Sequence, residues 1–217
     1  NLSMGVAYDG DGDRCLAVDE NGNEIDGDKI MAIISSSLRK KGKLAKDTIV
    51  ATVMSNLGLN KYARDNGLEL LQTKVGDRYV LEEMLKDGFN LGGEQSGHVI
   101  LLDYNPTGDG ILTSLMLIKS ILEENKKASQ MAQMVKLYPQ VLVNAKVNSE
   151  KKYGFKDDKE IKNAIEKLEK EFAGNGRVLI RPSGTEPLVR VMIEGEDQKY
   201  IQKKAEEIAK LIEAKLK

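Results

Sequence analysis

Residues 9–14, DGDGDR, place three carboxylates at alternate positions and end on an arginine. Glycine lacks a Cβ, so the chain can turn tightly enough here to aim alternate side chains at one point. Converging hard oxygen ligands suit Mg²⁺ or Ca²⁺, and arginine is a good bidentate partner for phosphate. The segment therefore indicates a metal site of Asp9, Asp11 and Asp13 with an anionic ligand beside it. An acidic surface turn is the alternative.

A calcium loop of the EF-hand type also begins D-x-D-x-D, and Glu20 would stand at its twelfth position. The sixth position of such a loop must be glycine for the sharp turn, but that position is Arg14 here. Short apolar runs of strand length, 5–8 and 15–18, flank the segment where an EF-hand needs helices. We therefore expect a loop between two strands, and a calcium loop is the lesser alternative.

A second polar loop is TKVGDR at 73–78, between an expected strand and an expected helix. Its glycine and the free N–H groups of the helix start can hold an anion. Lys74 could supply charge, or could transfer a proton if desolvation lowers its pKa. The alternative is that Asp77 caps the helix and Lys74 is solvated.

A third polar loop is GGEQSGH at 92–98. Glu94, Ser96 and His98 alternate, so in extended chain they would face one way and could bind sugar hydroxyls. His98 is the one histidine of the chain, and its ordinary pKa suits proton transfer near neutral pH. A purely structural histidine is the alternative.

The fourth polar loop is RPSGTEP at 181–187, with Arg190 beyond it. An arginine, two hydroxyls and backbone N–H groups around a glycine make a cradle suited to phosphate. A simple turn built on proline and glycine is the alternative.

The composition narrows the class of protein. A net charge of −1 over 217 residues leaves no global basic field that would attract nucleic acid or a membrane surface. No apolar run approaches the ~18 residues of a membrane span. The single cysteine, Cys15, excludes an internal disulfide and favours a reducing compartment, so we expect a cytoplasmic protein. Because the chain starts almost inside a strand, we also expect a fragment of a longer protein.

The elements that must hold these loops divide into two groups. Apolar spacing predicts an α/β domain up to about residue 137, with a hairpin first. Its expected helices are 29–38, 56–66, 77–87 and 109–124, and its expected buried strands are 48–53 and 69–73. On the third helix, the residues expected on one face are Val80, Leu81, Met84 and Leu85.

Pro139 and the apolar run 141–143 mark a change of pattern. From there the order is strand, helix, strand, strand, helix, with the expected segments 158–172, 177–181, 188–194 and 198–215 after the first strand. Two helices and three strands in so short a stretch predict a separate small α+β domain. Residues 148–158 are expected to be a loop within it.

The four polar loops, in this order, resemble the motifs of the α-D-phosphohexomutase superfamily. Within it, GEQSGH and RPSGTEPLVRVMIE are most similar to the bacterial phosphoglucosamine mutases. The resemblance spans nearly the whole chain. It implies the end of a domain 2 at 1–24, left as a β-hairpin with the metal loop. A mixed-sheet α/β domain 3 at 25–138 would bind the sugar, and a small α+β domain 4 at 139–217 would bind phosphate.

The resemblance implies interconversion of glucosamine 6-phosphate and glucosamine 1-phosphate, on the route to UDP-N-acetylglucosamine and peptidoglycan precursors. In such enzymes a phosphoserine donates its phosphoryl group and a bisphosphorylated sugar forms as the intermediate. The residues that match the family's Mg²⁺ ligands are Asp9, Asp11 and Asp13.

The remaining roles are carried over from the same motifs. Arg14 matches an arginine near the reacting phosphate, and Lys74 and His98 fit positions for general acid–base work. Glu94 and Ser96 match contacts to the 3- and 4-hydroxyls of the sugar. The residues that fit the grip on the non-reacting phosphate are Arg181, Ser183, Gly184, Thr185 and Arg190.

The family's serine motif, similar to T-A-S-H-N-P, occurs nowhere in the sequence. We therefore expect no mutase turnover from the chain alone, and we expect the missing N-terminal domains of the same enzyme as its partner, beside the phosphosugar substrate. No nucleic acid or membrane partner is expected, and a homodimer is left open. The alternatives are a phosphomannomutase or phosphoglucomutase of the same superfamily, and a non-catalytic module that binds metal or sugar phosphate.

Overall fold

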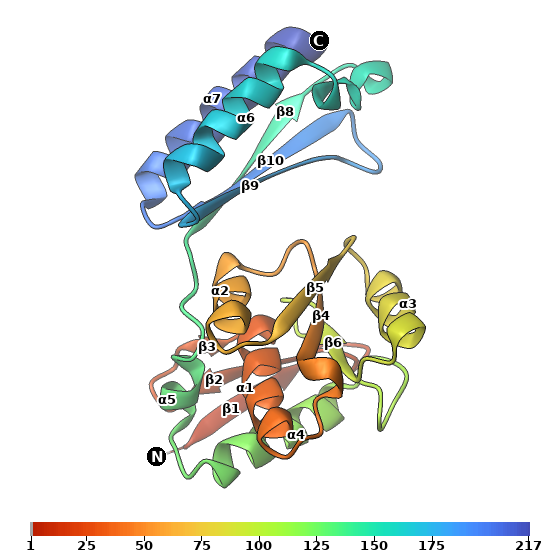
Figure 1. The fold of residues 1–217 in the computed structure, drawn as a ribbon, viewed down its shortest axis with the longest axis vertical. Helices are drawn as coiled ribbons and strands as arrows, with labels where there is room; N and C mark the ends of the chain where they lie inside the picture. The colour runs from red at the N-terminus through yellow and green to blue at the C-terminus, as the bar shows by residue number, and fades with distance from the viewer. Residues whose placement is uncertain (1) are drawn as a thin grey trace. The chain divides into compact units, whose positions relative to one another are not determined.

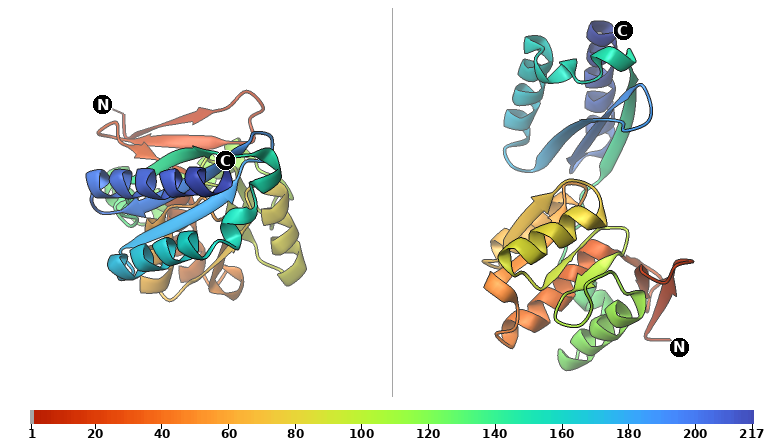
Figure 2. Two further views of the ribbon diagram at one scale, coloured as in Figure 1. Left: turned by 90° about the horizontal axis from the view of Figure 1, so that it is seen from above. Right: turned by 90° about the vertical axis from the view of Figure 1, so that its right-hand side faces the viewer.

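The computed structural model describes residues 2–217, which form two compact units that divide between Leu137 and Tyr138. Each unit has a hydrophobic core of its own, and Figures 1 and 2 show the elements of each. Over the described range, no helix has both the length and the apolar character needed to cross a membrane.

The first unit carries two sheets. A three-stranded antiparallel sheet has the order β1-β2-β3, and a four-stranded mixed sheet has the order β5-β4-β6-β7. The strands are β1 (Met4–Tyr8), β2 (Cys15–Asp19), β3 (Glu24–Ile25), β4 (Thr48–Thr52), β5 (Glu69–Thr73), β6 (Leu91–Gly93) and β7 (Val99–Leu101). The helices are α1 (Gly27–Lys40), α2 (Leu57–Asp65), α3 (Asp77–Asp87), α4 (Gly110–Glu123) and α5 (Ala128–Ala132), and a 3₁₀ turn covers Ala45–Asp47.

The inner strand β4 alternates between two hydrophobic clusters. Ile49 and Ala51 join the main core with residues of α1, whereas Val50 packs with Val80 and Met84 of α3. Period-two alternation of this kind, apolar on both sides, is typical of a strand buried on both faces. Helices therefore cover both faces of the mixed sheet, with α1 and α3 on opposite sides (Figure 1).

Short polar side chains begin three of the helices of the first unit. Asp26 accepts from Lys29 N at the start of α1, Asn56 caps α2, and Asp109 caps α4. Each carboxylate or amide oxygen satisfies one of the backbone N–H groups that a helix start leaves without a partner. The helices expected near these residues are confirmed.

One predicted helix face was too wide. Val80 and Met84 of α3 are buried, but Leu85 is 60% exposed. Leu81 is half-buried and packs against the same cluster as Val80 and Met84, so three of the four predicted residues face the sheet and Leu85 alone does not. The short helix α5 was not predicted, because five residues are too few for a periodic signal.

The second unit is a small α+β domain, as predicted. Its antiparallel sheet has the order β8-β10-β9, and α7 and α6 pack together on one face of it (Figure 1). The elements are β8 (Gln140–Lys146), α6 (Lys159–Phe172), β9 (Gly176–Pro182), β10 (Leu188–Gly195) and α7 (Gln198–Leu216).

Residues 148–158 are not the plain loop that was predicted. Two 3₁₀ turns, Ser149–Lys151 and Gly154–Lys156, lie within them. Phe155 is buried in the core of the unit, and this burial gives the polar segment a fixed course over the domain.

Ile193 tests the position of the second core. It is fully buried in the central strand β10, so Ile193→Ala should lower the free energy of unfolding by about 2–5 kcal/mol. Leu142→Ala on the neighbouring strand is the control, because Leu142 is 46% exposed and should cost less than about 0.5 kcal/mol. Urea unfolding followed by circular dichroism measures both, and equal losses would contradict this core.

Candidate functional site

The DGDGDR segment is the loop between antiparallel strands β1 and β2. Asp9 accepts a hydrogen bond from Arg14 N at 3.3 Å through its side chain, and one from Gly12 N at 3.3 Å through its carbonyl. Glu20 does not turn toward this loop but accepts hydrogen bonds from the backbone N and the hydroxyl of Ser129. Strands on both sides and the engagement of Glu20 exclude the EF-hand alternative.

The carboxylates of this loop have different surroundings. Desolvation acts to raise the pKa of Asp9, but the hydrogen bond from Arg14 N and the charge of Arg14 help to hold it below its usual range. Asp13 Oδ1 is buried and has no hydrogen-bond partner within residues 2–217. The described residues form no cluster of three or more metal-ligating side chains, so Asp9, Asp11 and Asp13 share a loop without converging on one point.

The backbone joins this loop directly to the GEQSGH segment. Arg14 and His98 form an antiparallel β-bridge, and Cys15 N donates to Gly97 O at 3.1 Å. Cys15 itself is buried, and burial raises the pKa of its thiol to about 11, so a reactive thiolate is excluded near neutral pH. The Arg14–His98 bridge and the bond from Cys15 N to Gly97 O thus hold two loops side by side that are far apart in the sequence.

Residues 94–98 are not an extended chain, which is the condition under which Glu94, Ser96 and His98 were expected to face one way. Gly97 N donates to Glu94 O at 3.0 Å, and Gly97 has a φ of +95°, which closes a tight turn. Glu94 is half-buried, Ser96 is exposed, and His98 is 3% exposed. The turn separates these side chains, so they do not share one face of a strand.

The start of α1 holds this turn, through residues that the sequence reading missed. Gly27 N donates to Gln95 O at 2.9 Å, and Gln95 Nε2 donates to Asp26 Oδ2 at 3.2 Å. A Cβ on Gly27 would stand 2.1 Å from Glu94 O. The only signal in the sequence was a glycine directly after the capping aspartate, which also has a purely helical explanation.

The KVGD loop reaches the same place. Gly76 N, with a φ of +128°, donates to Glu94 Oε1 at 3.1 Å. Gly76 rather than Asp77 is the N-cap of α3, so the capping alternative for Asp77 is wrong. His98 Nε2 lies 3.7 Å from Asp13 Oδ2 and 4.0 Å from Asp77 Oδ2. Three of the four polar loops thus meet in the first unit.

Lys74 is exposed at this edge of the unit. Its Nζ stands 5.7 Å from the centre of the Tyr79 ring, within range of a cation–π contact. The Arg14 side chain is also about half exposed, with Nε 4.0 Å from Asp9 Oδ2. Both cations therefore remain accessible to an anionic ligand.

The fourth loop lies in the second unit, between β9 and β10. Arg181 and Arg190 are directly opposite each other across these strands, so both side chains stand on one face of the sheet. The Nε of each is buried without a hydrogen-bond partner in the described part of the chain. Desolvation, and then the charge of Arg190, lower the pKa of Arg181. An anion between the two guanidinium groups would relieve this repulsion.

Hydrogen bonds between nearby residues close the turn between β9 and β10. Ser183 is buried, its N donates to Leu188 O at 2.8 Å, and its hydroxyl accepts from Glu186 N at 3.2 Å. Gly184 and Thr185 are exposed at the tip. Lys152, which the sequence reading also missed, donates through Nζ to Ser183 O at 3.0 Å. The cation lies in a segment that looked like a simple polar loop, so no sequence signal marked it.

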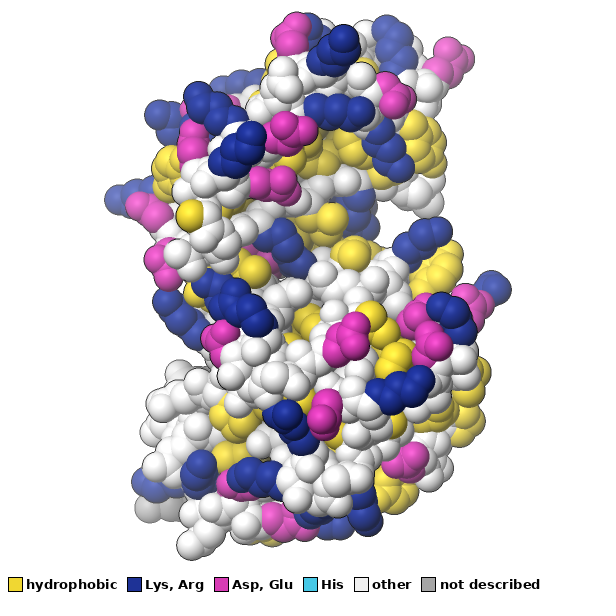
Figure 3. Space-filling view, viewed as in Figure 1, with side chains coloured by type: hydrophobic (Ala, Val, Ile, Leu, Met, Phe, Trp, Pro, Cys, Tyr) yellow, Lys and Arg dark blue, Asp and Glu magenta, His cyan; other side chains and the backbone are white. Residues whose placement is uncertain are grey.

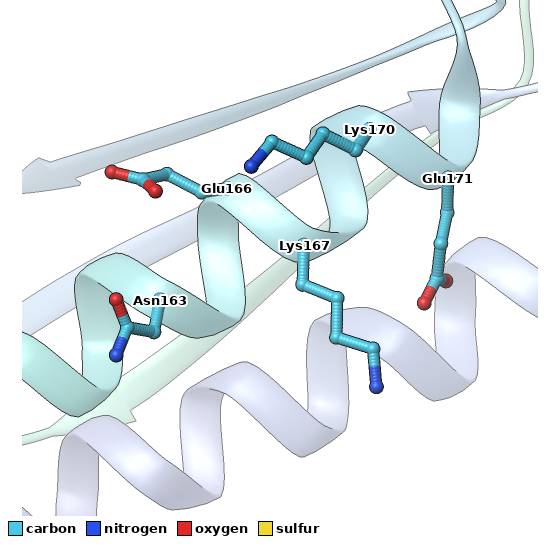
Figure 4. Close-up of a pocket in the computed structure, with 5 residues that line it drawn as sticks. All are labelled: Asn163, Glu166, Lys167, Lys170 and Glu171. Atoms are coloured by element: carbon cyan, nitrogen blue, oxygen red, sulfur yellow. The ribbon is translucent and has the colours of Figure 1, made fainter.

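Two further surface features carry no comparable chemistry. On the face drawn in Figure 3, basic and acidic side chains are intermixed, which gives no field of a single sign. The hollow drawn in Figure 4 is lined by Asn163, Glu166, Lys167, Lys170 and Glu171, all from α6. Side chains of mixed charge along one helix are typical of a solvated face.

Gly27→Ala tests the support of the Glu94 turn. The added Cβ would collide with backbone atoms of 94–97, so we expect the free energy of unfolding to fall by about 1–3 kcal/mol. Gly10→Ala is the control, because a Cβ there meets no atom within 4 Å. Thermal unfolding measures both, and a Gly27→Ala protein as stable as the control would contradict this packing.

Curated proteins of similar sequence include phosphoglucosamine mutases. The chain is 60% identical to the one from Ruminiclostridium cellulolyticum over 213 residues, which are 98% of this chain and 47% of that protein. It is 56% identical to the one from Clostridioides difficile over 216 residues, which are 100% of this chain and 48% of that protein. The chain therefore spans about half the length of the curated relatives it matches.

Solved structures share the fold. The crystal structure of Aspergillus fumigatus N-acetylphosphoglucosamine mutase in complex with GlcNAc-6P and magnesium is 21% identical and matches with a TM-score of 0.75, over 96% of this chain and 48% of that one. A putative phosphomannomutase from Thermus thermophilus is 23% identical and matches with a TM-score of 0.67, over 97% of this chain and 46% of that one.

Two family models cover most of the sequence. The model of the phosphoglucomutase/phosphomannomutase alpha/beta/alpha domain III matches residues 26–138, and the model of the C-terminal domain matches residues 142–211. The first of these contains the KVGD and GEQSGH loops, and the second contains the paired arginines. The chain therefore belongs to the phosphoglucomutase/phosphomannomutase family, of which it carries domain III and the C-terminal domain.

Proposed function

We propose that the chain acts as part of a phosphoglucosamine mutase, which interconverts glucosamine 6-phosphate and glucosamine 1-phosphate through a phosphoserine and a bisphosphorylated sugar. The observation that carries the proposal is the Arg14–His98 bridge, which brings the carboxylate loop and the sugar loop together. The 60% identity to a phosphoglucosamine mutase supports this choice within the family. Such a reaction would supply a precursor of UDP-N-acetylglucosamine for peptidoglycan.

Asp9, Asp11 and Asp13 would hold Mg²⁺. The chemistry of the donors fits Mg²⁺, because they are carboxylate oxygens and because the buried Asp13 Oδ1 has no partner among residues 2–217. The three side chains do not converge on one point, so they would have to turn toward the ion. When bound, Mg²⁺ neutralises charge on a transferring phosphoryl group. Arg14, half exposed beside Asp9, would bind the reacting phosphate as a bidentate donor.

His98 and Lys74 would move protons at the sugar. The Nε2 atom of His98 faces the carboxylates of Asp13 and Asp77, so a proton on this atom would point into the polar site. Burial of the ring excludes bulk water from this atom. Lys74 is exposed in the KVGD loop, so the desolvation that its proton transfer requires would have to come from the bound ligand.

Glu94 and Ser96 would bind the sugar hydroxyls. One carboxylate oxygen of Glu94 is oriented by Gly76 N, which leaves the other oxygen to accept from a hydroxyl. In the second unit, Arg181 and Arg190 would bind the non-reacting phosphate, with the turn of Ser183, Gly184 and Thr185 around it. The unpartnered Nε atoms of both arginines in the described chain support this role.

The nucleophilic serine would come from the half of the protein that this chain does not match. We expect the purified chain to produce no glucosamine 1-phosphate, and we expect turnover once it is fused behind the N-terminal half of the C. difficile relative. Asp13→Asn in that fusion should lower kcat by about 10²-fold or more, as is usual when charge stabilisation at the reacting group is lost. A coupled assay for glucosamine 1-phosphate measures each protein.

Turnover by the chain alone would contradict the assignment of the serine. A fusion that converts mannose or glucose phosphates but not glucosamine 6-phosphate would favour the phosphomannomutase or phosphoglucomutase alternative. A folded fusion without any mutase activity would favour the non-catalytic binding module.

Lys152→Ala tests the phosphate cradle. Loss of its bond to Ser183 O should loosen the turn and weaken binding of inorganic phosphate about three- to tenfold, the equivalent of one hydrogen bond. Lys151→Ala is the matched control, because it removes the same charge from the next residue, whose Nζ bonds to Lys217 O instead. Isothermal titration calorimetry measures both, and equal affinities in the two variants would refute the role of Lys152.

A further inference from the structure

Residues 107–110, Thr-Gly-Asp-Gly, lie at the start of α4 and belong to none of the four polar loops. Gly108 is buried against the imidazole ring of His98. A Cβ on Gly108 would stand 2.3 Å from His98 Nε2, 2.4 Å from Cδ2 and 2.6 Å from Cε1. The ring therefore packs on the bare backbone of Gly108, where no side chain fits.

The same short segment touches the carboxylate loop. Gly110 N donates to Gly12 O at 2.9 Å, and a Cβ on Gly110 would stand 2.6 Å from Arg14 O. Between the two glycines, Asp109 caps α4 through Leu112 N and accepts from Asn105 Nδ2 at 3.2 Å. The segment is thus fixed to a long helix at one end and presses on two loops of the site.

Hydrogen bonds do not fix the His98 ring within the described residues. Its Nδ1 atom is buried without a partner there. Its Nε2 atom is 3.7 Å from Asp13 and 4.0 Å from Asp77, beyond hydrogen-bond distance. In the absence of such bonds, steric contact decides the orientation of the ring, and the ring lies directly on Gly108.

We propose that Gly108 is a positioning residue, which sets the direction of His98 Nε2 toward the Asp13 carboxylate, and that Gly110 places the backbone of the carboxylate loop on the same support. The role of the ring in proton transfer rests on the proposed function, whereas the packing does not. Alanine at position 108 would drive the ring away from this direction without removing any group that contacts a ligand.

The chain has a single histidine, so the imidazole C–H signals in an NMR spectrum report on His98 alone. Gly108→Ala should shift these signals at constant pH. Gly154→Ala is the control and should leave these signals in place. Gly154 lies in the second unit, where an added Cβ would meet only the flexible end of the Leu216 side chain. Unchanged signals in a folded Gly108→Ala protein would overturn the proposal.

A double variant covers the case in which Gly108→Ala is too unstable for NMR. His98→Ala removes the ring, so adding Gly108→Ala to it should cost much less thermal stability than Gly108→Ala costs in the native sequence. An equal loss in both backgrounds would overturn the proposal, because Gly108 would then be needed for something other than the ring. Neither readout involves substrate, so a failure of the mutase assignment would appear separately, in the turnover of the fusion protein.

Discussion

Close packing of bare backbone is the constraint on which the site in the first unit depends. The Arg14–His98 bridge and the bonds from Gly27 to Gln95 and from Gly110 to Gly12 join four segments without an intervening side chain. At Gly27 and Gly110, contacts this close are possible only because glycine removes the Cβ. These segments are continuous with strands and helix starts, which hold their backbone in place. The polar side chains that the segments carry are therefore held in defined positions.

Both units contain buried polar atoms that lack hydrogen-bond partners among the described residues. Asp13 Oδ1 and His98 Nδ1 in the first unit, and the Nε atoms of Arg181 and Arg190 in the second, are buried without hydrogen-bond partners in the described residues. Buried groups without partners cost free energy, and the facing arginines add repulsion between like charges. The anion and the cation proposed above would give several of these groups partners and so offset this cost.

The order and type of the long elements could be read from the sequence, because apolar periodicity and capping residues are local. Asp26, Asn56 and Asp109 begin helices that were expected near them. The sequence did not reveal features that depend on how an element packs against another part of the chain. Val80, Leu81 and Met84 of α3 pack toward the sheet but Leu85 is exposed, and residues 94–98 turn because Gly97 adopts a positive φ beside the start of α1.

The residues that can do chemistry are visible in the sequence, because the carboxylates of DGDGDR, the single histidine and the arginines around RPSGTEP are unusual in type and spacing. The sequence also predicted an α/β and an α+β part, since strand and helix periods are visible within short windows. Only the tertiary structure decided which loops touch. The supporting groups, Gln95, Gly108 and Lys152, have ordinary local contexts, and their contacts span 31 residues in the case of Lys152 and Ser183. Contacts between segments far apart in the chain are set by how whole elements pack, which no local pattern records.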